Sequence, residues 1–188
     1  ISALGSMTFI KKQTASSSST ISFVDGTSDV VLDDTYKEYI FTFNNIHAQT
    51  HGEQFTFNMS IDSGSNYNVA KTSTFFYARE EETGSSGSLA YRAAHDLAQG
   101  TGFQPIMDDV DITSYSGSGS GAGILKIYNP SDTTFVKHFI SRTHNLRDNT
   151  FASSNHCAGY GNTTSAVDAI QFKMSSGNID AGDICLYG

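Results

Sequence analysis

Hydrophobic and polar residues alternate along most of the chain. In the clearest stretch, Phe55, Phe57, Met59 and Ile61 are separated by single polar residues. Successive side chains of a β-strand point to opposite faces, so this period of two predicts a strand with one face in the core and the other in water. Such one-sided burial is typical of antiparallel sheets.

The same alternation recurs in eight further segments, which gives nine expected strands. The segments are 7–13, 20–24, 39–43, 55–61, 74–78, 123–128, 135–142, 170–174 and 184–186. The connections are rich in turn-forming residues, as in Asp62–Asn66, Gly84–Gly87 and Ser176–Asn178. Many short strands with polar turns predict an all-β fold, and we expect an antiparallel, jelly-roll-like β-sandwich with at most one short helix.

Two segments do not follow the strand pattern. In residues 89–97 apolar residues recur at helical spacing between possible capping residues, so a short helix and an irregular crossover with an edge strand both stay open. The residues concerned are Leu89, Ala93 and Leu97, with Ser86 or Ser88 before them and Gly100 after them. Residues 116–123 (SGSGSGAG) read as a long, mobile hairpin tip.

The 188 residues suffice for one domain with its own core. We expect residues 13–188 to form the sandwich and residues 1–12 to form an N-terminal docking segment or edge strand. Met7, Phe9 and Ile10 are the expected docking residues, by addition of a strand to a partner sheet.

Charge argues against two classes of partner. The formal net charge is -8, and the eleven basic residues are scattered. Binding of nucleic acid needs clustered Lys and Arg, and an anionic membrane surface repels an acidic chain. No apolar run approaches the roughly 20 residues that cross a bilayer. We therefore expect neither nucleic acid nor a membrane as a partner.

Only two cysteines are present, Cys157 and Cys185. A small secreted scaffold normally carries more cysteines, in pairs. The count favours two reduced thiols in a protein made in the cytosol, and a single disulfide is the alternative.

Two groups of residues have the types needed to bind a metal. His47 and His51 are four apart, but this segment ends a strand and enters a turn, so helical zinc-site geometry fails and we expect solvated loop histidines. Asp108, Asp109 and Asp111 could offer oxygen ligands to calcium, but the other ligands and the glycine of a calcium loop are missing. We expect an exposed acidic turn there, and a solvated loop at residues 80–82 (EEE).

Hydrolytic chemistry lacks its usual arrangements of residues. A glycosidase needs two carboxylates facing each other across a cleft, and the chain has no Glu-x-Asp-x-Glu string on a strand. Gly117-Ser118-Gly119 does not lie between a strand and a helix, as a nucleophilic serine elbow would. His156 and Cys157 are adjacent, so on a strand they point to opposite faces. We expect no enzymatic activity, no catalytic residue, no cofactor and no metal.

Tyrosines at turns favour contacts with other molecules. We expect five of them to be exposed: Tyr36, Tyr67, Tyr91, Tyr115 and Tyr160. Tyrosine beside asparagine suits a sugar site or a protein interface, and the absence of Trp weakens the first interpretation. The expected contact loops carry Tyr67, Tyr115, Tyr160 and Asn162.

Several segments together resemble a known group of proteins. They are Gln13–Phe23, Tyr128–Ser131 (YNPS), Phe135–Ile140 (FVKHFI), Ala158–Ile179 (AGYGNTTSAVDAIQFKMSSGNI) and the final Leu186–Gly188 (LYG). Nearly the whole chain is similar in this way to virion structural proteins encoded by marine tailed phages. Asp183 and Cys185 stand where that pattern leads us to expect small or basic residues. The resemblance implies a location in the particle and carries no catalytic residues.

Pattern and resemblance together favour one function over two others. We expect a non-enzymatic structural protein of a tailed-phage virion, assembled in the host cytoplasm, that decorates the capsid or forms part of a head or tail appendage. Its expected partners are other copies of itself, as a homotrimer, and other virion proteins. The alternative is a fibre-tip module that binds a receptor or a host surface glycan, and the third possibility is a polysaccharide depolymerase.

Overall fold

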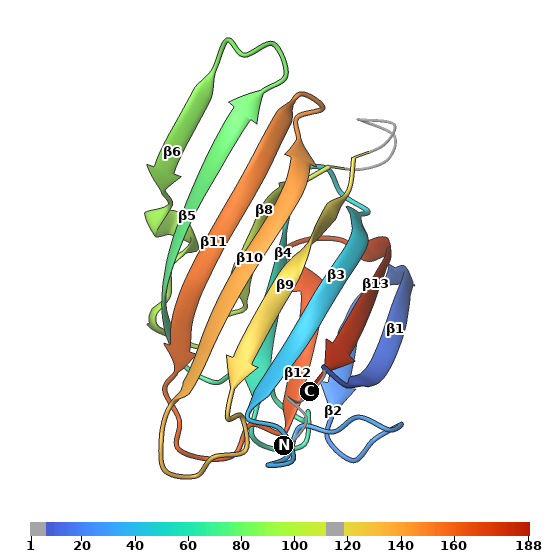
Figure 1. The fold of residues 1–188 in the computed structure, drawn as a ribbon, viewed down its shortest axis with the longest axis vertical. Helices are drawn as coiled ribbons and strands as arrows, with labels where there is room; N and C mark the ends of the chain where they lie inside the picture. The colour runs from blue at the N-terminus through green and yellow to red at the C-terminus, as the bar shows by residue number, and fades with distance from the viewer. Residues whose placement is uncertain (1–6, 112–118) are drawn as a thin grey trace, which may run out of the picture.

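The computed structural model describes residues 7–111 and 119–188, which form two antiparallel β-sheets packed face to face (Figure 1). The expected contact residue Tyr115 and residues 116–118 of the expected hairpin tip lie outside the described residues, and residues 121–123 of that tip begin a strand. Within the described residues the all-β, antiparallel β-sandwich is confirmed, and η1 (Ala93–His95), a single 3-10 turn, is its one short helix. The jelly-roll part of the expectation stays a prediction.

The larger sheet contains nine strands in the described part of the chain. Their order is β1-β13-β3-β9-β10-β11-β5-β6, and β7 pairs with β5 beside this path. The bounds are β1 (Phe9–Ser18), β13 (Ile179–Tyr187), β3 (Glu38–Ala48), β9 (Gly121–Tyr128), β10 (Lys137–Arg147), β11 (Phe151–Gly161), β5 (Lys71–Glu81), β6 (Gly87–Tyr91) and β7 (Ala98–Gly100).

The smaller sheet lies behind the larger one in Figure 1. Its order is β2-β12-β4-β8. The bounds are β2 (Ile21–Val24), β12 (Ala169–Met174), β4 (Glu53–Ser60) and β8 (Gln104–Val110). The larger sheet is therefore wider, and β5 and β6 extend past the edge strand β8 (Figure 1).

All nine expected strands are present, and the structure adds others that alternation did not predict. β11 was missed because its inward residues include Ser153 and Asn155, which are polar although they are buried. β8 was missed because almost all of its residues are buried, so it shows no alternation. In residues 89–97 the crossover interpretation is confirmed: β6 is an edge strand, and η1 follows it.

The N-terminal residues form an edge strand, and both cysteines are buried. β1 runs from Phe9 to Ser18 along the edge of the larger sheet, so the expected boundary at residue 12 falls inside this strand. Phe9 is exposed and lies 5.6 Å from Tyr187 between ring centroids, whereas Ile10 packs against the core. Cys157 and Cys185 are buried free thiols.

No helix in the two described ranges is long and apolar enough to span a membrane.

The core between the sheets is an aromatic cluster centred on Phe172. This ring stacks on Phe55 at a centroid distance of 5.6 Å and meets Phe41 and Phe43 edge-on at 5.2 and 5.3 Å. All four side chains are fully or almost fully buried. Edge-on and offset aromatic pairs add stability beyond the burial of their area, so this cluster fixes how the two sheets face each other.

Replacing Phe172 with alanine should lower the free energy of unfolding by about 3–5 kcal/mol, because it removes a fully buried ring and leaves a cavity. Guanidinium unfolding followed by circular dichroism measures the change. Phe135→Ala is the matched control, since Phe135 is 70% exposed, and should change the value by under about 0.5 kcal/mol. Equal effects of the two changes would contradict this account of the core.

Candidate functional site

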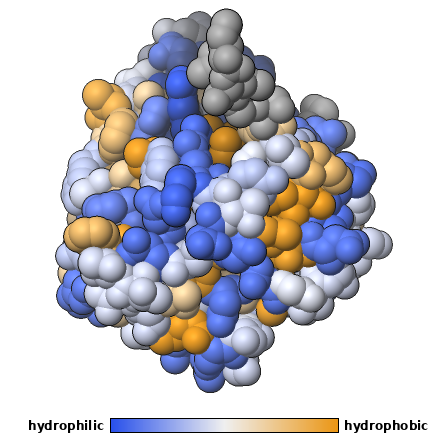
Figure 2. All heavy atoms as spheres, turned by 60° about the horizontal axis from the view of Figure 1, so that its bottom comes forward, coloured by the Kyte–Doolittle hydropathy of each residue, from blue (hydrophilic) through white to orange (hydrophobic). Residues whose placement is uncertain are grey.

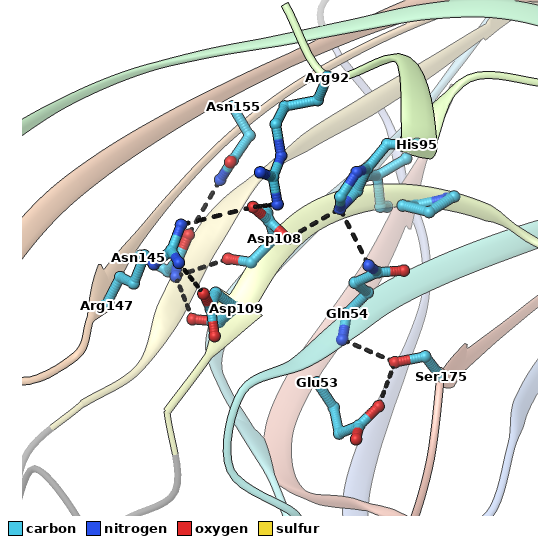
Figure 3. A network of polar contacts seen from close by, with 12 residues as sticks. Glu53, Gln54, Arg92, His95, Asp108, Asp109, Asn145, Arg147, Asn155 and Ser175 are labelled. Carbon is cyan, nitrogen blue, oxygen red and sulfur yellow. Dashed lines mark hydrogen bonds and ion pairs between the residues drawn. The ribbon is translucent and has the colours of Figure 1, made fainter. Parts of the chain in front are cut away.

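Polar side chains, together with the buried apolar residues of β8, join this strand to the larger sheet. Thr143 on β10 donates to the carbonyl of Ile106 at 2.6 Å. The Asn145 amide donates to the carbonyls of Asp108 and Asp109 at 3.0 and 2.9 Å (Figure 3). Buried carbonyl groups need a hydrogen-bond partner, and here side chains of the facing sheet supply it.

Asp108 is the buried centre of this network. One carboxylate oxygen lies 2.8 Å from Nε2 of His95, and the other lies 3.2 Å from Nη2 of Arg92 and 3.7 Å from Nη1 of Arg147. Burial opposes ionisation of Asp108, but the hydrogen bond with His95 and the two guanidinium charges outweigh it and hold its pKa below the ordinary value.

His95 links Asp108 on β8 to Gln54 on the neighbouring strand β4. Its ring is buried, lies 5.0 Å from the Phe75 ring between centroids, and places Nε2 at 2.9 Å from Nε2 of Gln54. The backbone N–H of Gln54 in turn donates to Oγ of Ser175 at 2.8 Å, and that hydroxyl donates to Glu53 (Figure 3). The network thus crosses from the larger sheet through β8 to β4.

Arg147 carries the network to the β10–β11 turn. Its guanidinium pairs with Asp109, and its Nε lies 3.1 Å from Oδ2 of Asp148. Burial raises the pKa of Asp109; Arg147 opposes this, while the neighbouring carboxylates of Asp108, Asp148 and Asp111 add to it. Negative charge is therefore crowded at this end of β8.

Asp111 is fully buried just beyond β8. Its carboxylate accepts hydrogen bonds from the backbone N–H groups of Asp148 and Asn149 at 3.2 and 2.9 Å, which holds the β10–β11 turn. Its Oδ1 also lies 3.3 Å from Nδ1 of His51 in the β3–β4 turn.

The expectation of an exposed acidic turn at Asp108, Asp109 and Asp111 is therefore wrong. Asp108 and Asp111 are buried and Asp109 is half-buried, because histidine, guanidinium and backbone N–H groups from other segments compensate their charge. The three carboxylates also turn to different partners instead of converging on one calcium ion.

Two related expectations need correction as well. His47 lies within β3, and His51 is half-buried against Asp111, so neither is a freely solvated loop residue. The run of glutamates is not a loop throughout: β5 continues to Glu81, and only Glu82 lies in the turn.

His156 and Cys157 point to opposite faces of β11, as predicted. The ring of His156 stacks on Phe76 on the outer face, with 4.8 Å between centroids, whereas Cys157 is buried on the inner face. Burial raises the pKa of the Cys157 thiol strongly, so the reactive thiolate form is disfavoured.

The structure brings together two of the expected contact residues. The Asn162 amide donates to Oε1 of Gln99 at 2.6 Å, and the Gln99 amide donates to the hydroxyl of Tyr160 at 3.4 Å. Tyr67 does not join them, and its carbonyl instead accepts from the amide of Asn58. Tyr67 and Tyr160 are half-buried rather than fully exposed.

Tyr91 is exposed as predicted, but Tyr36 is not. Tyr36 packs against the core, 5.7 Å from the ring of Tyr39 between centroids, and is half-buried.

Sequence reasoning missed an apolar surface on the outer side of the larger sheet. It is formed by neighbouring residues of β6, β5, β11 and β10, which we call the contact face: Phe76, Leu89, Tyr91, Ile140, His156 and Ala158. Phe76 is 41% exposed, Leu89 75%, Tyr91 60% and Ile140 49%. The adjacent Phe75 and Phe76 were a usable signal, because two successive strand residues cannot both enter the core.

A pocket of about 560 Å³ lies at the end of the sandwich that Figure 2 turns toward the viewer. We call it the end pocket. It is bordered by the β9–β10 connection: Tyr128, Asn129, Asp132, Thr134, Phe135, Val136, His138 and Thr164. Apolar and hydrophilic residues alternate over this end of the molecule (Figure 2).

Buried lysines support the loops at this end. Lys137 and Lys71 flank Gly161 on the inner face of the larger sheet and are fully buried. Nζ of Lys137 donates to the carbonyl of Phe135 at 2.7 Å, and Nζ of Lys71 donates to that of Val69 at 2.7 Å. Burial lowers the pKa of both amines, that of Lys71 to about 7.

No family model, curated protein or solved structure matches the chain.

Replacing Asp108 with asparagine should lower the free energy of unfolding by about 3–5 kcal/mol at pH 7, because it leaves the charges of Arg92 and Arg147 poorly compensated. The folded-state pKa of Asp108 is lowered, so its carboxylate stabilises the fold above the unfolded-state pKa of about 3.9 and loses this effect as the pH falls through the folded-state value. Denaturant unfolding at pH 7 measures the loss of stability, and repeating it in steps down to pH 3 measures how the contribution of Asp108 depends on pH.

Asp34→Asn is the control for this change, since Asp34 is exposed, and it should have little effect at either pH. If Asp108→Asn were equally harmless at pH 7, the network would not hold β8 in place.

Proposed function

We propose that the chain is a non-enzymatic structural protein of a tailed-phage virion, a capsid decoration or a head or tail appendage subunit, that assembles through its contact face. The observation that carries the proposal is the set of large apolar side chains exposed side by side on rigid strands. Contiguous apolar patches on a soluble protein usually mark a binding surface. The resemblance to virion proteins supports the particle as its location.

The composition of the contact face favours a protein partner. Its members are aromatic, aliphatic or imidazole side chains, and Arg142 lies beside His156 at its margin. Interface centres are depleted in Lys, Glu and Asp and enriched in aromatic residues and Arg. A rigid sheet also loses little conformational entropy when it binds.

Charge favours another copy of the chain as the partner. The whole chain has a formal net charge of -8, yet none of the six contact-face residues is acidic. The contact face therefore does not repel the acidic surface of another copy. A ring of three copies needs a heterologous contact, in which the contact face of each copy packs against a different surface of the next, and we propose a homotrimer built in this way.

Docking to other virion proteins is assigned to the opposite edge of the larger sheet. β1 ends the sheet order, and Met7 and Phe9 are exposed near its start. An edge strand offers unpaired backbone groups to a strand of a partner, which agrees with docking through Met7, Phe9 and Ile10.

Replacing Ile140 with aspartate should convert the trimer to monomer, because it places a charge that loses its water within each contact. Size-exclusion chromatography with light scattering, at about 10–100 μM protein, measures the mass. Thr27→Asp adds the same charge to an exposed turn beyond β2 and should leave the trimer intact. A wild-type chain that stays monomeric throughout, or a trimer that survives Ile140→Asp, would refute assembly through this face.

The end pocket favours a second candidate function, a fibre-tip module that binds a host glycan. Tyr128, Phe135 and His138 offer ring surfaces, and Asn129 and Asp132 offer polar groups in the same pocket. Sugar sites combine flat apolar surfaces with a few oriented hydrogen-bonding groups. Lys137 holds the carbonyl of Phe135 and so fixes one side of the pocket.

If this second function holds, a glycan array probed with the labelled chain at about 1–10 μM should show binding that falls at least about tenfold in Phe135→Ala, through loss of ring stacking. Leu89→Ala removes an equally exposed side chain far from the pocket and should leave glycan binding unchanged. An array without signal would exclude the glycan-binding candidate and leave the structural one.

A further inference from the structure

Three connections that lie far apart in the sequence meet at one end of β8. They are the β3–β4 turn with His51, the residue after β8, Asp111, and the β10–β11 turn with Asp148. Each of these side chains offers one metal-binding atom, and the three atoms lie within 4.8 Å of one another.

The group is held in place by contacts that do not involve a metal. Asp111 is fully buried, and two backbone N–H groups of the β10–β11 turn fix its carboxylate. Asp148 and Asn149 have φ values of 51° and 60°, so the turn is tight and brings Asp148 back toward Asp111. Nε of Arg147 contacts Oδ2 of Asp148, so this contact does not use the other carboxylate oxygen, Oδ1.

The spacing of two of these atoms suits one small cation. Nδ1 of His51 is buried and lies 3.3 Å from Oδ1 of Asp111. Two ligands about 2.1 Å from a tetrahedral zinc ion stand about 3.4 Å apart. The side chain of Asp148 is 42% exposed, so an ion can reach the group from water.

The local charge also suits a divalent cation. Asp109, Asp111 and Asp148 bring three carboxylates to this end of β8, and Arg147 supplies one guanidinium against them. With neutral imidazole the excess is two negative charges. A divalent cation cancels this excess, whereas without it the carboxylates repel one another in a partly buried place.

We propose that His51, Asp111 and Asp148 bind one divalent transition-metal cation, with Zn²⁺ as the representative ion and water in the remaining position. An imidazole ligand beside two carboxylates suits zinc and its neighbours, whereas calcium takes oxygen ligands. Arg147 contacts Oδ2 of Asp148 and so orients this carboxylate, as outer-sphere groups of metal sites commonly do.

The bound ion links the two sheets to each other. It ties the end of β8, in the smaller sheet, to the β3–β4 turn and to the β10–β11 hairpin of the larger sheet. This site is separate from both the contact face and the end pocket, so it does not depend on either function proposed above.

The test uses the untagged full chain, stripped with EDTA and dialysed. Isothermal titration with ZnCl₂ should give one ion per chain, and Zn²⁺ should raise the melting temperature. His51→Ala and Asp148→Asn should each weaken binding at least about tenfold and abolish the rise in melting temperature. Both residues lie in turns at the surface, so these variants keep the core intact; Asp111 is left unchanged because it also holds the β10–β11 turn.

Matched controls separate this site from other metal-binding side chains. His144 on the outer face of β10 and Asp34 are exposed, and His144→Ala and Asp34→Asn should bind Zn²⁺ within about twofold of the wild-type chain. CaCl₂ in tenfold excess should not displace the zinc. Absence of zinc binding, or binding that survives either His51→Ala or Asp148→Asn, overturns the three-ligand site.

Discussion

Burial of one face of each sheet against the other is the constraint on which the rest of this structure depends. The aromatic cluster around Phe172 fills the space between the sheets and sets how they face each other. The positions that face this cluster must then be apolar, whereas inward positions away from it carry buried polar side chains such as Asn145 and Asn155. The polar network lies beside the aromatic packing, and the contact face lies on the outer side of the larger sheet.

The polar network follows from the unequal widths of the two sheets. β8 is the edge strand of the smaller sheet, and it lies over β10 and β11 of a sheet that continues past it. An apolar edge strand would leave its carbonyl groups without partners, so Thr143 and Asn145 of the larger sheet satisfy them. His95 and Arg92, which follow β6, contact Asp108 on the side of β8 that has no neighbouring strand.

Outside the core, apolar side chains remain where packing does not explain them. Phe76 and Ile140 occupy outward positions on β5 and β10, where water would ordinarily favour polar residues. Their neighbours on β11, His156 and Ala158, are also uncharged or weakly polar, whereas Ile140 has Lys126 on its other side, on β9. A surface of this composition is consistent with a subunit that is covered in its assembled state.

The sequence by itself determined the fold class, since alternation of apolar and polar residues predicts strands. It did not determine the burial of each position: in residues 55–61, Thr56, Asn58 and Ser60 are buried as well, and Ile61 is exposed. It also determined that His156 and Cys157 point apart if they lie on a strand, because this follows from strand geometry. It did not determine β11 or β8, whose buried residues are partly polar or lack alternation. Only the tertiary structure decided which polar residues meet: it buried Asp108 and Asp111 and placed His51 and Asp148 beside Asp111. The local pattern of apolar and polar residues predicts which side chains of one segment face the core and which face water. The partners of a buried charge come from distant segments, and only the packing of the sheets brings these together.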